Sequence, residues 1–252
     1  MTFNNKALLS LGVLLFLGCA STPMKQLMPS EFITLKKSKY ETLNSPDSLQ
    51  GWEKGLWFYK HEKYEEAIPL LESHKDKNIA EVEHAYGYMI ERFKRDYKEA
   101  SQWYKKAITH ANLPNSKHNL ANLYNNGAGV KQDEDKALEL YKESAKQGYH
   151  YAQYTLALNY CKGSGGVSED FGKAYYWFQQ SYHNGNSYAA NKIGHMYENG
   201  YHGFKTNHQK ALEWYTLSAQ MGNPKAQENV VRIKMLIQQK KTGKSGSIII
   251  RG

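Results

Sequence analysis

Cysteine is scarce in this sequence, and the scarcity limits how the chain can be stabilised. The 252 residues include only two cysteines, Cys19 and Cys161, so at most one disulfide bond could form within a chain. The start of the chain also lacks an apolar run long enough to cross a membrane. The run Ala7–Leu17 has 11 residues, whereas a membrane-spanning helix needs about 20, so a cleaved export signal is favoured over an anchor helix.

Catalytic motifs are lacking as well. Three of the ten histidines, His195, His202 and His208, lie close in sequence, but their spacing crosses a predicted loop and forms no zinc signature. The run Gly-Lys-Ser at 243–245 lacks the earlier glycine of a phosphate-binding loop, because Gln238 stands there. No nucleophile elbow or Cys/His motif is present either. We therefore expect no catalytic residue, no metal and no cofactor.

Acidic residues are missing from the end of the chain. Residues 232–252 carry six lysines and arginines and no acid, and only Lys6 is charged before Cys19. The formal net charge of +9 therefore comes mostly from the tail, and the body of the chain is close to neutral. A body without a basic excess argues against a nucleic-acid groove, so we expect no nucleic-acid partner.

What the sequence does contain is a repeat of 37 residues. Ala137, Ala174 and Ala211 stand 37 residues apart, and three further columns keep the same step. These columns are the glycines Gly148, Gly185 and Gly222, the serines Ser144, Ser181 and Ser218, and the aromatic residues Tyr104, Tyr141, Phe178 and Tyr215. A period in the range of roughly 20–50 residues is typical of repeat arrays, in which each unit buries its apolar face against its neighbours.

Three full units each contain a glycine-rich loop between two predicted helices, at 127–130, 163–167 and 200–204. Glycine adopts positive φ at little cost, so the chain can reverse there within a few residues. The second helices are expected to start at a capping residue, which is Asp133 or Asp135, Asp170 and Asn207. They are expected to end at Gly148, Gly185 and Gly222 in a left-handed conformation.

Weaker units flank these three. Two precede them, at 48–73 and 81–112, and the first reverses near 61–63 without glycine. After the last unit, residues 224–241 place apolar side chains on one helical face, which predicts a single capping helix.

The motif of the third unit resembles the Sel-1-like repeat, a relative of the tetratricopeptide repeat. The resemblance rests on Leu120, Ala121, Tyr124, Gly127, Gly129, Val130, Lys136, Ala137, Leu140, Tyr141, Ser144, Ala145 and Gly148, and it extends over roughly residues 48–231. It implies an all-α fold, an α-solenoid or superhelix of about five antiparallel helix pairs plus a C-terminal capping helix. The predicted domains are a signal peptide at 1–18, a tether at 19–47, the repeat array at 48–241 and a flexible basic tail at 242–252.

The junction at Cys19 resembles the lipobox of bacterial lipoproteins, in which the thiol is diacylated and becomes the first mature residue. By resemblance to sorting rules in two-membrane bacteria, Ala20 after the cysteine indicates the outer membrane. A soluble exported protein with an incidental cysteine is the alternative. If Cys19 carries lipid, Cys161 cannot form a disulfide within the chain and is expected to be a small packed residue. An intermolecular disulfide or thiol chemistry at Cys161 is the other reading.

Residues that the repeat leaves free provide the candidate binding site. If the first helix of each pair lines the concave face, as in tetratricopeptide folds, two rows of side chains face a groove, with further residues beside them. The rows are His84, His118, Tyr154 and Asn191, and Tyr88, Asn122, Leu158 and His195, with Asn125, Tyr151 and Tyr188 beside them. Most of these side chains are polar or aromatic and can form hydrogen bonds, which fits a groove for an extended peptide segment. A merely solvated surface is the alternative.

The functional prediction follows from this groove. We predict a non-catalytic protein–protein interaction scaffold of the bacterial cell envelope, an outer-membrane lipoprotein that faces the periplasm and binds a protein or peptide partner. Two alternatives stay open. One is a cell-wall-directed hydrolase or penicillin-binding activity, because some proteins of the resembling family are assigned such chemistry. The other is a surface-exposed adhesion or host-interaction factor, which shares the binding physics but faces outward.

Overall fold

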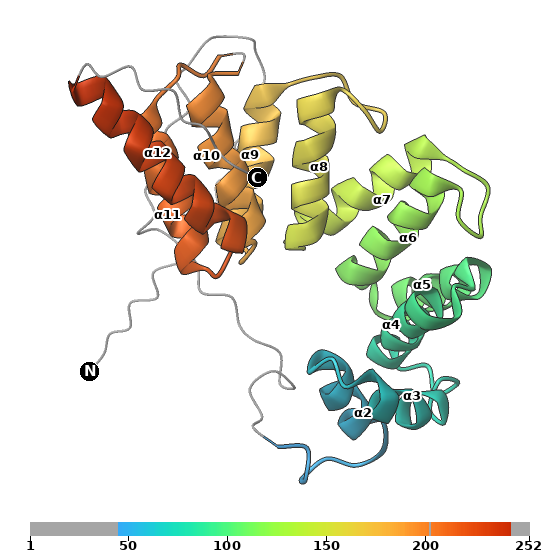
Figure 1. Ribbon diagram of the computed structural model, residues 1–252. Helices are drawn as coiled ribbons and strands as arrows, with labels where there is room; N and C mark the ends of the chain where they lie inside the picture. The colour runs from blue at the N-terminus through green and yellow to red at the C-terminus, as the bar shows by residue number, and fades with distance from the viewer. Residues whose placement is uncertain (1–44, 202, 243–252) are drawn as a thin grey trace, which may run out of the picture. The chain divides into compact units, whose positions relative to one another are not determined.

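The computed structural model describes residues 45–201 and 203–242, and every regular element in these residues is helical (Figure 1). Five antiparallel helix pairs follow one another along the chain, and a single helix ends the described part. The pairs are α2 (Gly51–Lys60) with α3 (Tyr64–Glu72), α4 (Ala80–Met89) with α5 (Tyr97–Ala111), α6 (Pro114–Asn126) with α7 (Glu134–Lys146), α8 (His150–Lys162) with α9 (Phe171–His183), and α10 (Ser187–Asn199) with α11 (His208–Gln220), before α12 (Pro224–Thr242). The predicted α-solenoid with a final single helix is confirmed.

Several predictions fall on residues outside the described part. They are the signal peptide at 1–18, the lipidation site Cys19, most of the tether, His202, and the tail beyond Thr242. Among the helices that the structure does describe, none combines the length and apolarity needed to cross a membrane.

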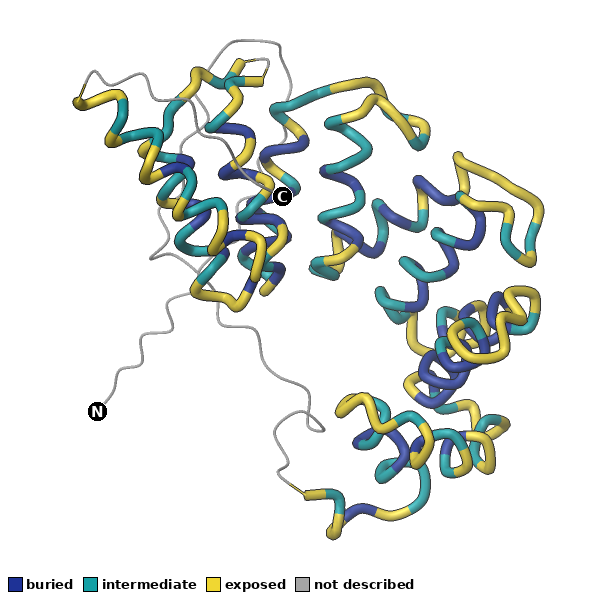
Figure 2. Tube along the Cα trace, in the orientation of Figure 1, coloured by how far each residue is buried: buried dark blue, intermediate teal, exposed yellow. Residues whose placement is uncertain are grey.

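The core runs along the array where consecutive helices meet. Each helix packs against the next one in the chain, and Figure 2 shows buried residues on these facing sides and exposed residues in the loops. Leu56, Leu71, Tyr104, Leu156, Phe178, Ile193, Tyr215 and Ile233 are among the largest fully buried side chains. Because each pair contributes to this core, no unit can bury its apolar face alone.

Small residues let the two helices of a pair approach closely. Ala137, Ala174 and Ala211 are essentially fully buried in the second helices. In the first helices, a Cβ atom added to Gly194 would lie 2.7 Å from the ring of Tyr215, which is closer than packed atoms come. The alternation of small and aromatic columns in the sequence is therefore explained by helix packing.

The serine column forms a hydrogen bond that recurs in three pairs. Ser144 Oγ donates to the carbonyl oxygen of Pro114 at 2.6 Å, and Ser181 and Ser218 donate at 2.7 Å to those of His150 and Ser187. Each acceptor belongs to the first residue of the first helix in the same pair. The periodicity identified the column but not the bond, which ties the end of each second helix to the start of its partner.

Helix ends follow the predicted capping. The side chains of Asp133, Asp170 and Asn207 each accept a hydrogen bond from the backbone N–H group of the residue three positions later in the chain, at 2.9, 2.8 and 3.0 Å. Asp133, rather than Asp135, is thus the cap of α7. Gly148, Gly185 and Gly222 have φ values of +87°, +95° and +85°, which confirms the predicted left-handed ends.

The first two pairs turn without glycine. Glu62 adopts φ +59° in the turn between α2 and α3. Helix α4 runs on into a π-helical turn, Ile90–Lys94, which ends at Arg95 with φ +55°. Side chains other than glycine are strained in this left-handed region, so these two turns depend on the surrounding packing more than the glycine loops do.

Candidate functional site

Aromatic side chains from the beginning of the array converge on one place, which we call the aromatic cluster: Tyr59, Tyr88, His118, Tyr149 and Tyr151. The ring centroids of Tyr59 and Tyr88 are 5.6 Å apart, and those of His118 and Tyr149 are 5.4 Å apart. Burial raises the pKa of Tyr59 well above its usual value, and the nearby hydroxyls of Tyr88 and Tyr149 raise it further. The cluster thus consists of two groups of rings in contact, Tyr59 with Tyr88 and His118 with Tyr149 and Tyr151, carried by the first helices of four successive pairs and the residue just before α8.

A hydrogen-bond chain fixes the ring of His118 inside the cluster. Tyr141 donates from its hydroxyl to Asn122 Oδ1 at 2.6 Å, and Asn122 Nδ2 lies 3.3 Å from His118 Nε2. Because an amide NH2 group only donates, His118 Nε2 is the acceptor, and the proton of a neutral ring resides on Nδ1. Burial lowers the pKa of His118 to about 4, with a further contribution from His150, so the ring is neutral near pH 7.

The Nδ1–H group of His118 is left as a donor without an acceptor. This nitrogen is buried and has no hydrogen-bond partner among the residues that the structure describes. Buried donors are nearly always paired in folded proteins, so an unpaired one calls for an explanation. It is one of five enclosed side-chain atoms without a partner in the described part of the chain, and the rings around it shield it from direct contact with a ligand.

One predicted groove residue, His84, is buried beside the ring of Tyr59 instead of facing a groove. His84 is only 6% exposed, its Nδ1 lies 2.9 Å from Ser116 Oγ, and its Nε2 lies 3.5 Å from the hydroxyl of Tyr59. Burial, with a smaller effect of Lys60, lowers its pKa to about 3. The prediction that His84 lines an open groove is therefore corrected, because its imidazole fills the space between successive first helices.

The remaining predicted residues are spread along the first helices. Tyr154 is half-buried against the ring of Phe178, and Asn125 is half-buried with its amide directed to Asn126. Tyr151 and Tyr188, one period apart, are 50% and 52% exposed.

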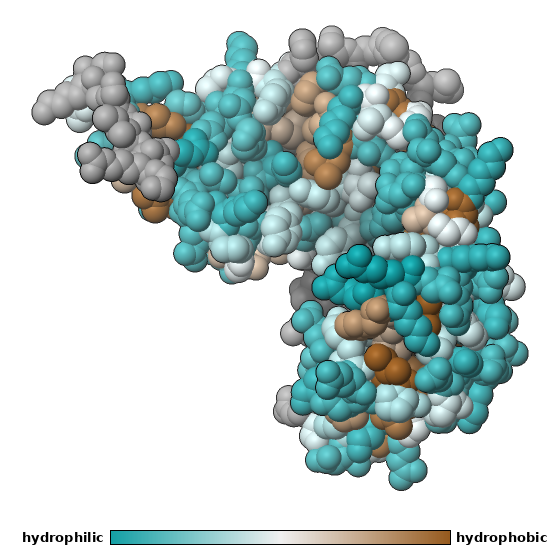
Figure 3. Space-filling model, turned by 45° about the vertical axis from the view of Figure 1, so that its right-hand side comes forward, coloured by the Kyte–Doolittle hydropathy of each residue, from teal (hydrophilic) through white to brown (hydrophobic). Residues whose placement is uncertain are grey.

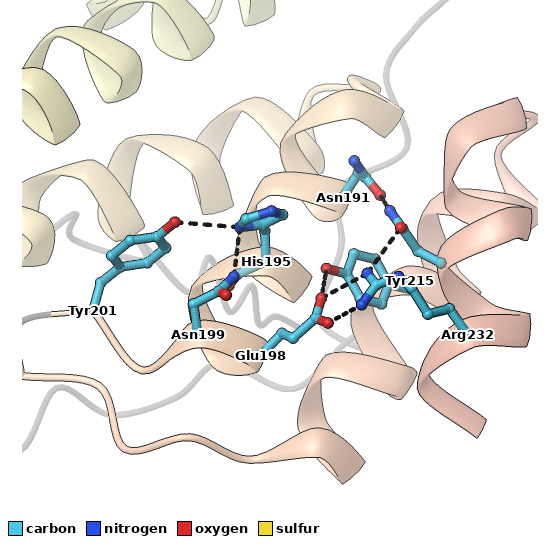
Figure 4. A network of polar contacts seen from close by, with 8 residues as sticks. Asn191, His195, Glu198, Asn199, Tyr201, Tyr215 and Arg232 are labelled. Atoms are coloured by element: carbon cyan, nitrogen blue, oxygen red, sulfur yellow. Dashed lines mark hydrogen bonds and ion pairs between the residues drawn. The ribbon is translucent and has the colours of Figure 1, made fainter. Parts of the chain in front are cut away.

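Asn191 belongs to a network that fastens the last helix (Figure 4). Its Oδ1 accepts from Asn229 Nδ2 at 2.9 Å, and Arg232 of α12 forms an ion pair with Glu198 of α10. The hydrogen bond from Arg232, outweighing the effect of burial, lowers the pKa of the Glu198 carboxyl. Tyr215 donates to the same carboxylate at 2.6 Å. The polar groups at this end of the row are therefore occupied in holding α12.

A cleft of about 230 Å³ lies between α8, α9 and α10, and we call it the α8–α10 cleft. Two predicted residues, Leu158 and His195, line it. The sequence prediction did not assign its other lining residues to the site, and they are Cys161, Lys162, Phe171, Phe178, Lys192, Met196 and Tyr201. The signal that could have found them is the replacement of tyrosine by Phe178 in the aromatic column.

Three rings form one wall of this cleft. The ring of Tyr201 lies nearly parallel to those of Phe171 and His195, with interplanar angles of 4° and 14° and centroid distances of 5.3 and 6.2 Å. Figure 4 shows Tyr201 and Asn199 beside His195, and Asn199 Nδ2 lies 2.8 Å from His195 Nδ1. Burial raises the pKa of the Cys161 thiol to about 11, so it is an uncharged apolar lining group near pH 7.

In the described part of the chain, no group of three histidine, cysteine, aspartate or glutamate side chains is arranged to hold a metal ion. The visible surface is largely hydrophilic, with hydrophobic residues gathered in several separate patches (Figure 3). The arrangement is therefore one of contact surfaces and a small cleft.

Comparisons with known proteins agree with this picture. The sequence matches the Sel1 repeat over residues 78–112, 114–149, 150–186 and 187–223, which leaves the α2–α3 pair outside the match. A Sel1 repeat protein from Oxalobacter formigenes is 32% identical, with a TM-score of 0.63 over 71% of this chain and 73% of that one. The protein c5321, a protective antigen of uropathogenic Escherichia coli with an SLR fold, is 26% identical, with a TM-score of 0.61 over 73% of this chain and 40% of that one.

A further structure, from Klebsiella pneumoniae, is 24% identical with a TM-score of 0.52, covers 73% of this chain and 91% of that one, and shows the likeness of fold alone. No curated protein matches the chain closely enough to count as a relative. Sel1 and tetratricopeptide-like repeats generally act as protein–protein interaction scaffolds and are typically non-catalytic. Because four matched repeats cover more than half of its length, this chain belongs to the Sel1 repeat family.

Proposed function

We propose that this chain is a non-catalytic scaffold of the bacterial cell envelope that binds an extended polypeptide segment across the first helices of its pairs. The observation that carries the proposal is the pair of half-exposed tyrosines Tyr151 and Tyr188, which stand one period apart on first helices, with Tyr151 in ring contact with Tyr149 and His118 of the aromatic cluster. Their exposed rings provide the surface that a bound segment covers.

Tyrosine suits such a surface for two reasons. Its ring buries a large apolar area while its hydroxyl forms hydrogen bonds, and it loses little side-chain freedom on binding. Tyr151 of the cluster and Tyr188, at the equivalent place in α10, are both half exposed, and Tyr188 extends the surface beyond the cluster. The segment would therefore follow the array, with one contact in each pair.

Photo-crosslinking in cells tests the proposal. A photoreactive residue replaces Tyr151 or Tyr188, and in a matched control it replaces Tyr176, which is 46% exposed but lies on the second helix α9. We expect a defined polypeptide to be captured from positions 151 and 188 and not from 176. Equal capture from all three positions would contradict binding on the first helices.

The enzyme alternative has a separate test. Purified protein is assayed with nitrocefin and with muropeptides, and we expect no turnover above a heat-denatured control. Turnover that survives further purification would replace the scaffold proposal by a cell-wall-directed activity.

The cellular location forms the second part of the proposal. A lipid on Cys19 would hold the array at the outer membrane, and the tether would let it face the periplasm. We expect labelled palmitate to enter the wild-type chain and not Cys19→Ser. Proteinase added to intact cells should leave the array uncut, whereas rapid cleavage would place it on the outer surface, as an adhesion or host-interaction factor requires.

A further inference from the structure

The repeat allows each residue of the α8–α10 cleft to be compared with its counterparts in other pairs. In the α4–α5 and α10–α11 pairs, the tyrosine of the aromatic column donates to a glutamate at 2.6 Å: Tyr104 to Glu91, in the π-helical turn that continues α4, and Tyr215 to Glu198 of α10. In the α6–α7 pair, Tyr141 donates instead to Asn122. A polar link between hydroxyl and first helix is thus present in all three.

The α8–α9 pair lacks this link. Phe178 stands where the other pairs have a tyrosine. Cys161 stands at the position of Glu91 and Glu198. Leu158 stands at the position of Asn122 and His195. Three polar positions have therefore become apolar together, and they surround the cleft rather than fill it. The ring of Phe178 is fully buried and serves the core, whereas Leu158 and Cys161 are only half-buried at the cleft, so packing within the chain does not explain their apolar character.

The rim of the cleft is positively charged. Lys162 and Lys192 are exposed, and neither forms an ion pair or hydrogen bond with any residue in the described ranges. Both ammonium groups lie near enough to affect the Cys161 thiol, as does the carboxylate of Glu169. The nearby Glu198 is already paired with Arg232. Two free lysines beside an apolar floor favour a ligand that joins an apolar group to negative charge.

We propose that the α8–α10 cleft is the anchor subsite of the scaffold, and that it takes one large apolar side chain of a polypeptide segment flanked by acidic residues. This inference rests on the proposed polypeptide binding and names the partner chemistry at one place. The cleft is smaller than the ~300–1,000 Å³ typical of small-molecule sites, which favours a single side chain over a whole ligand. Leu158, Phe178 and Met196 contact the side chain, and Lys162 and Lys192 attract the flanking carboxylates.

Methyl NMR on the purified chain tests the apolar contact. Met196 lines the floor, and its methyl signal is assigned among those of the seven methionines with a Met196→Leu variant. The probe is an acetylated and amidated peptide, Ser-Asp-Phe-Asp-Ser, and the two controls replace its Phe by Ala or both Asp by Asn. We expect the probe to shift the Met196 signal with saturation, and each control to bind at least tenfold more weakly.

Variants built from the repeat itself separate binding from folding. The double variant Cys161→Glu with Phe178→Tyr recreates the link of Tyr104 with Glu91 and should lower affinity for the probe at least tenfold without lowering Tm. If this variant does not fold, Leu158→Asn, which copies Asn122, gives a second measurement. Lys162→Gln with Lys192→Gln should weaken binding and reduce its salt dependence, whereas the exposed pair Lys131→Gln with Lys146→Gln should not.

Several outcomes overturn the inference. If the three peptides bind equally, the cleft does not select a segment that joins an apolar side chain to acidic residues. If hexanoate binds more tightly than the probe, the cleft is a site for a small amphiphile. If the chain self-associates with concentration and the double variant does not, the cleft binds a second copy of the chain. If Tyr151 still captures a polypeptide in cells while the probe fails, the scaffold function stands and only the anchor subsite is lost. If the probe binds as expected while capture fails at both positions, the cleft remains and the binding surface on the first helices is wrong.

Discussion

The aromatic cluster lies on the first helices of four pairs, whereas the α8–α10 cleft lies between two first helices and the second helix α9, and the two regions differ in how their side chains pack. In the cluster, rings from four pairs pack in two groups, and the Nδ1–H of His118 is enclosed without an acceptor. In the cleft, three apolar substitutions leave a space open beneath two lysines. The difference shows that the repeat determines the course of the backbone, while the side chains at a few positions in each unit determine whether the space between neighbouring helices is filled or left as a cleft.

Removal of the cleft floor should have the largest effect. Phe178 is 1% exposed, so we expect Phe178→Ala to lower the free energy of unfolding by about 3–5 kcal/mol, through lost burial and the cavity left behind. Tyr201→Ala, at a wall residue that is 38% exposed, should cost less than about 1 kcal/mol. Urea unfolding measures both values. Similar losses for the two variants would mean that wall and floor are equally structural.

The second largest effect should be a loss of stability at acidic pH, and it should be larger at the aromatic cluster than at the cleft. Folding lowers the pKa of His84 to about 3 and of His118 to about 4, chiefly by burial, with smaller effects of Lys60 and His150. The unfolded chain therefore binds more protons, so this stability is complete above about pH 6.5 and is lost as the pH falls through that value toward 4 and 3. For His118 we expect a loss on the order of 2–3 kcal/mol.

Unfolding measured from pH 7.5 down to 4 checks this expectation. His118→Gln should flatten the pH profile markedly, and His195→Gln, at the cleft, should flatten it less, because the pKa of His195 is also lowered but its ring is exposed. A profile unchanged by His118→Gln would show that the acid sensitivity arises elsewhere.

The serine bonds should behave alike in both regions. Ser144→Ala, in the α6–α7 pair, and Ser181→Ala, in the α8–α9 pair that contributes to the cleft, each remove one buried hydrogen bond, which should cost about 1 kcal/mol. Differential scanning calorimetry of the two variants, with Ser218→Ala as a third, would compare them. If the losses of stability of these variants differ severalfold, the serine hydrogen bond does not make the same contribution in each of the three pairs.

The rim lysines should have the smallest effect on stability. Because Lys162 and Lys192 are exposed and unpaired with the described residues, changing either to glutamine should alter the free energy of unfolding by less than about 0.5 kcal/mol. Urea unfolding measured beside peptide affinity gives both numbers from one preparation. A clear loss of stability would indicate that these lysines serve the fold rather than a partner.

Much of the fold could be predicted from the sequence because each unit repeats the same local chemistry. Asp170 and Asn207 cap their helices, Gly185 and Gly222 end them, and Ala174 is buried, all as their spacing indicated. These features depend on contacts inside one pair, which the 37-residue period reports directly.

The candidate site could be predicted only in part, because its contacts cross from one pair to another. The sequence placed Leu158 and His195 on one row, and both line the cleft. The sequence prediction did not assign Phe178 to the cleft, because an aromatic residue at a packing position of the repeat indicates a core residue. The indication of a site is that Phe178 lacks the hydroxyl that the tyrosines of the other pairs have. The approach of His118 to Tyr149 and Tyr151 depends on how successive pairs are rotated, and no spacing within a unit encodes that rotation.

The serine bond also bears on how such an array can change in length. Donor and acceptor belong to the same helix pair, so a pair that is duplicated, deleted or moved to another array carries its own fastening with it. The α8–α10 cleft draws residues from two pairs and so exists only at the seam where those two meet. Duplication of either pair alone would lengthen the array without duplicating the cleft. The two adjacent pairs would have to be duplicated together for the cleft to be preserved.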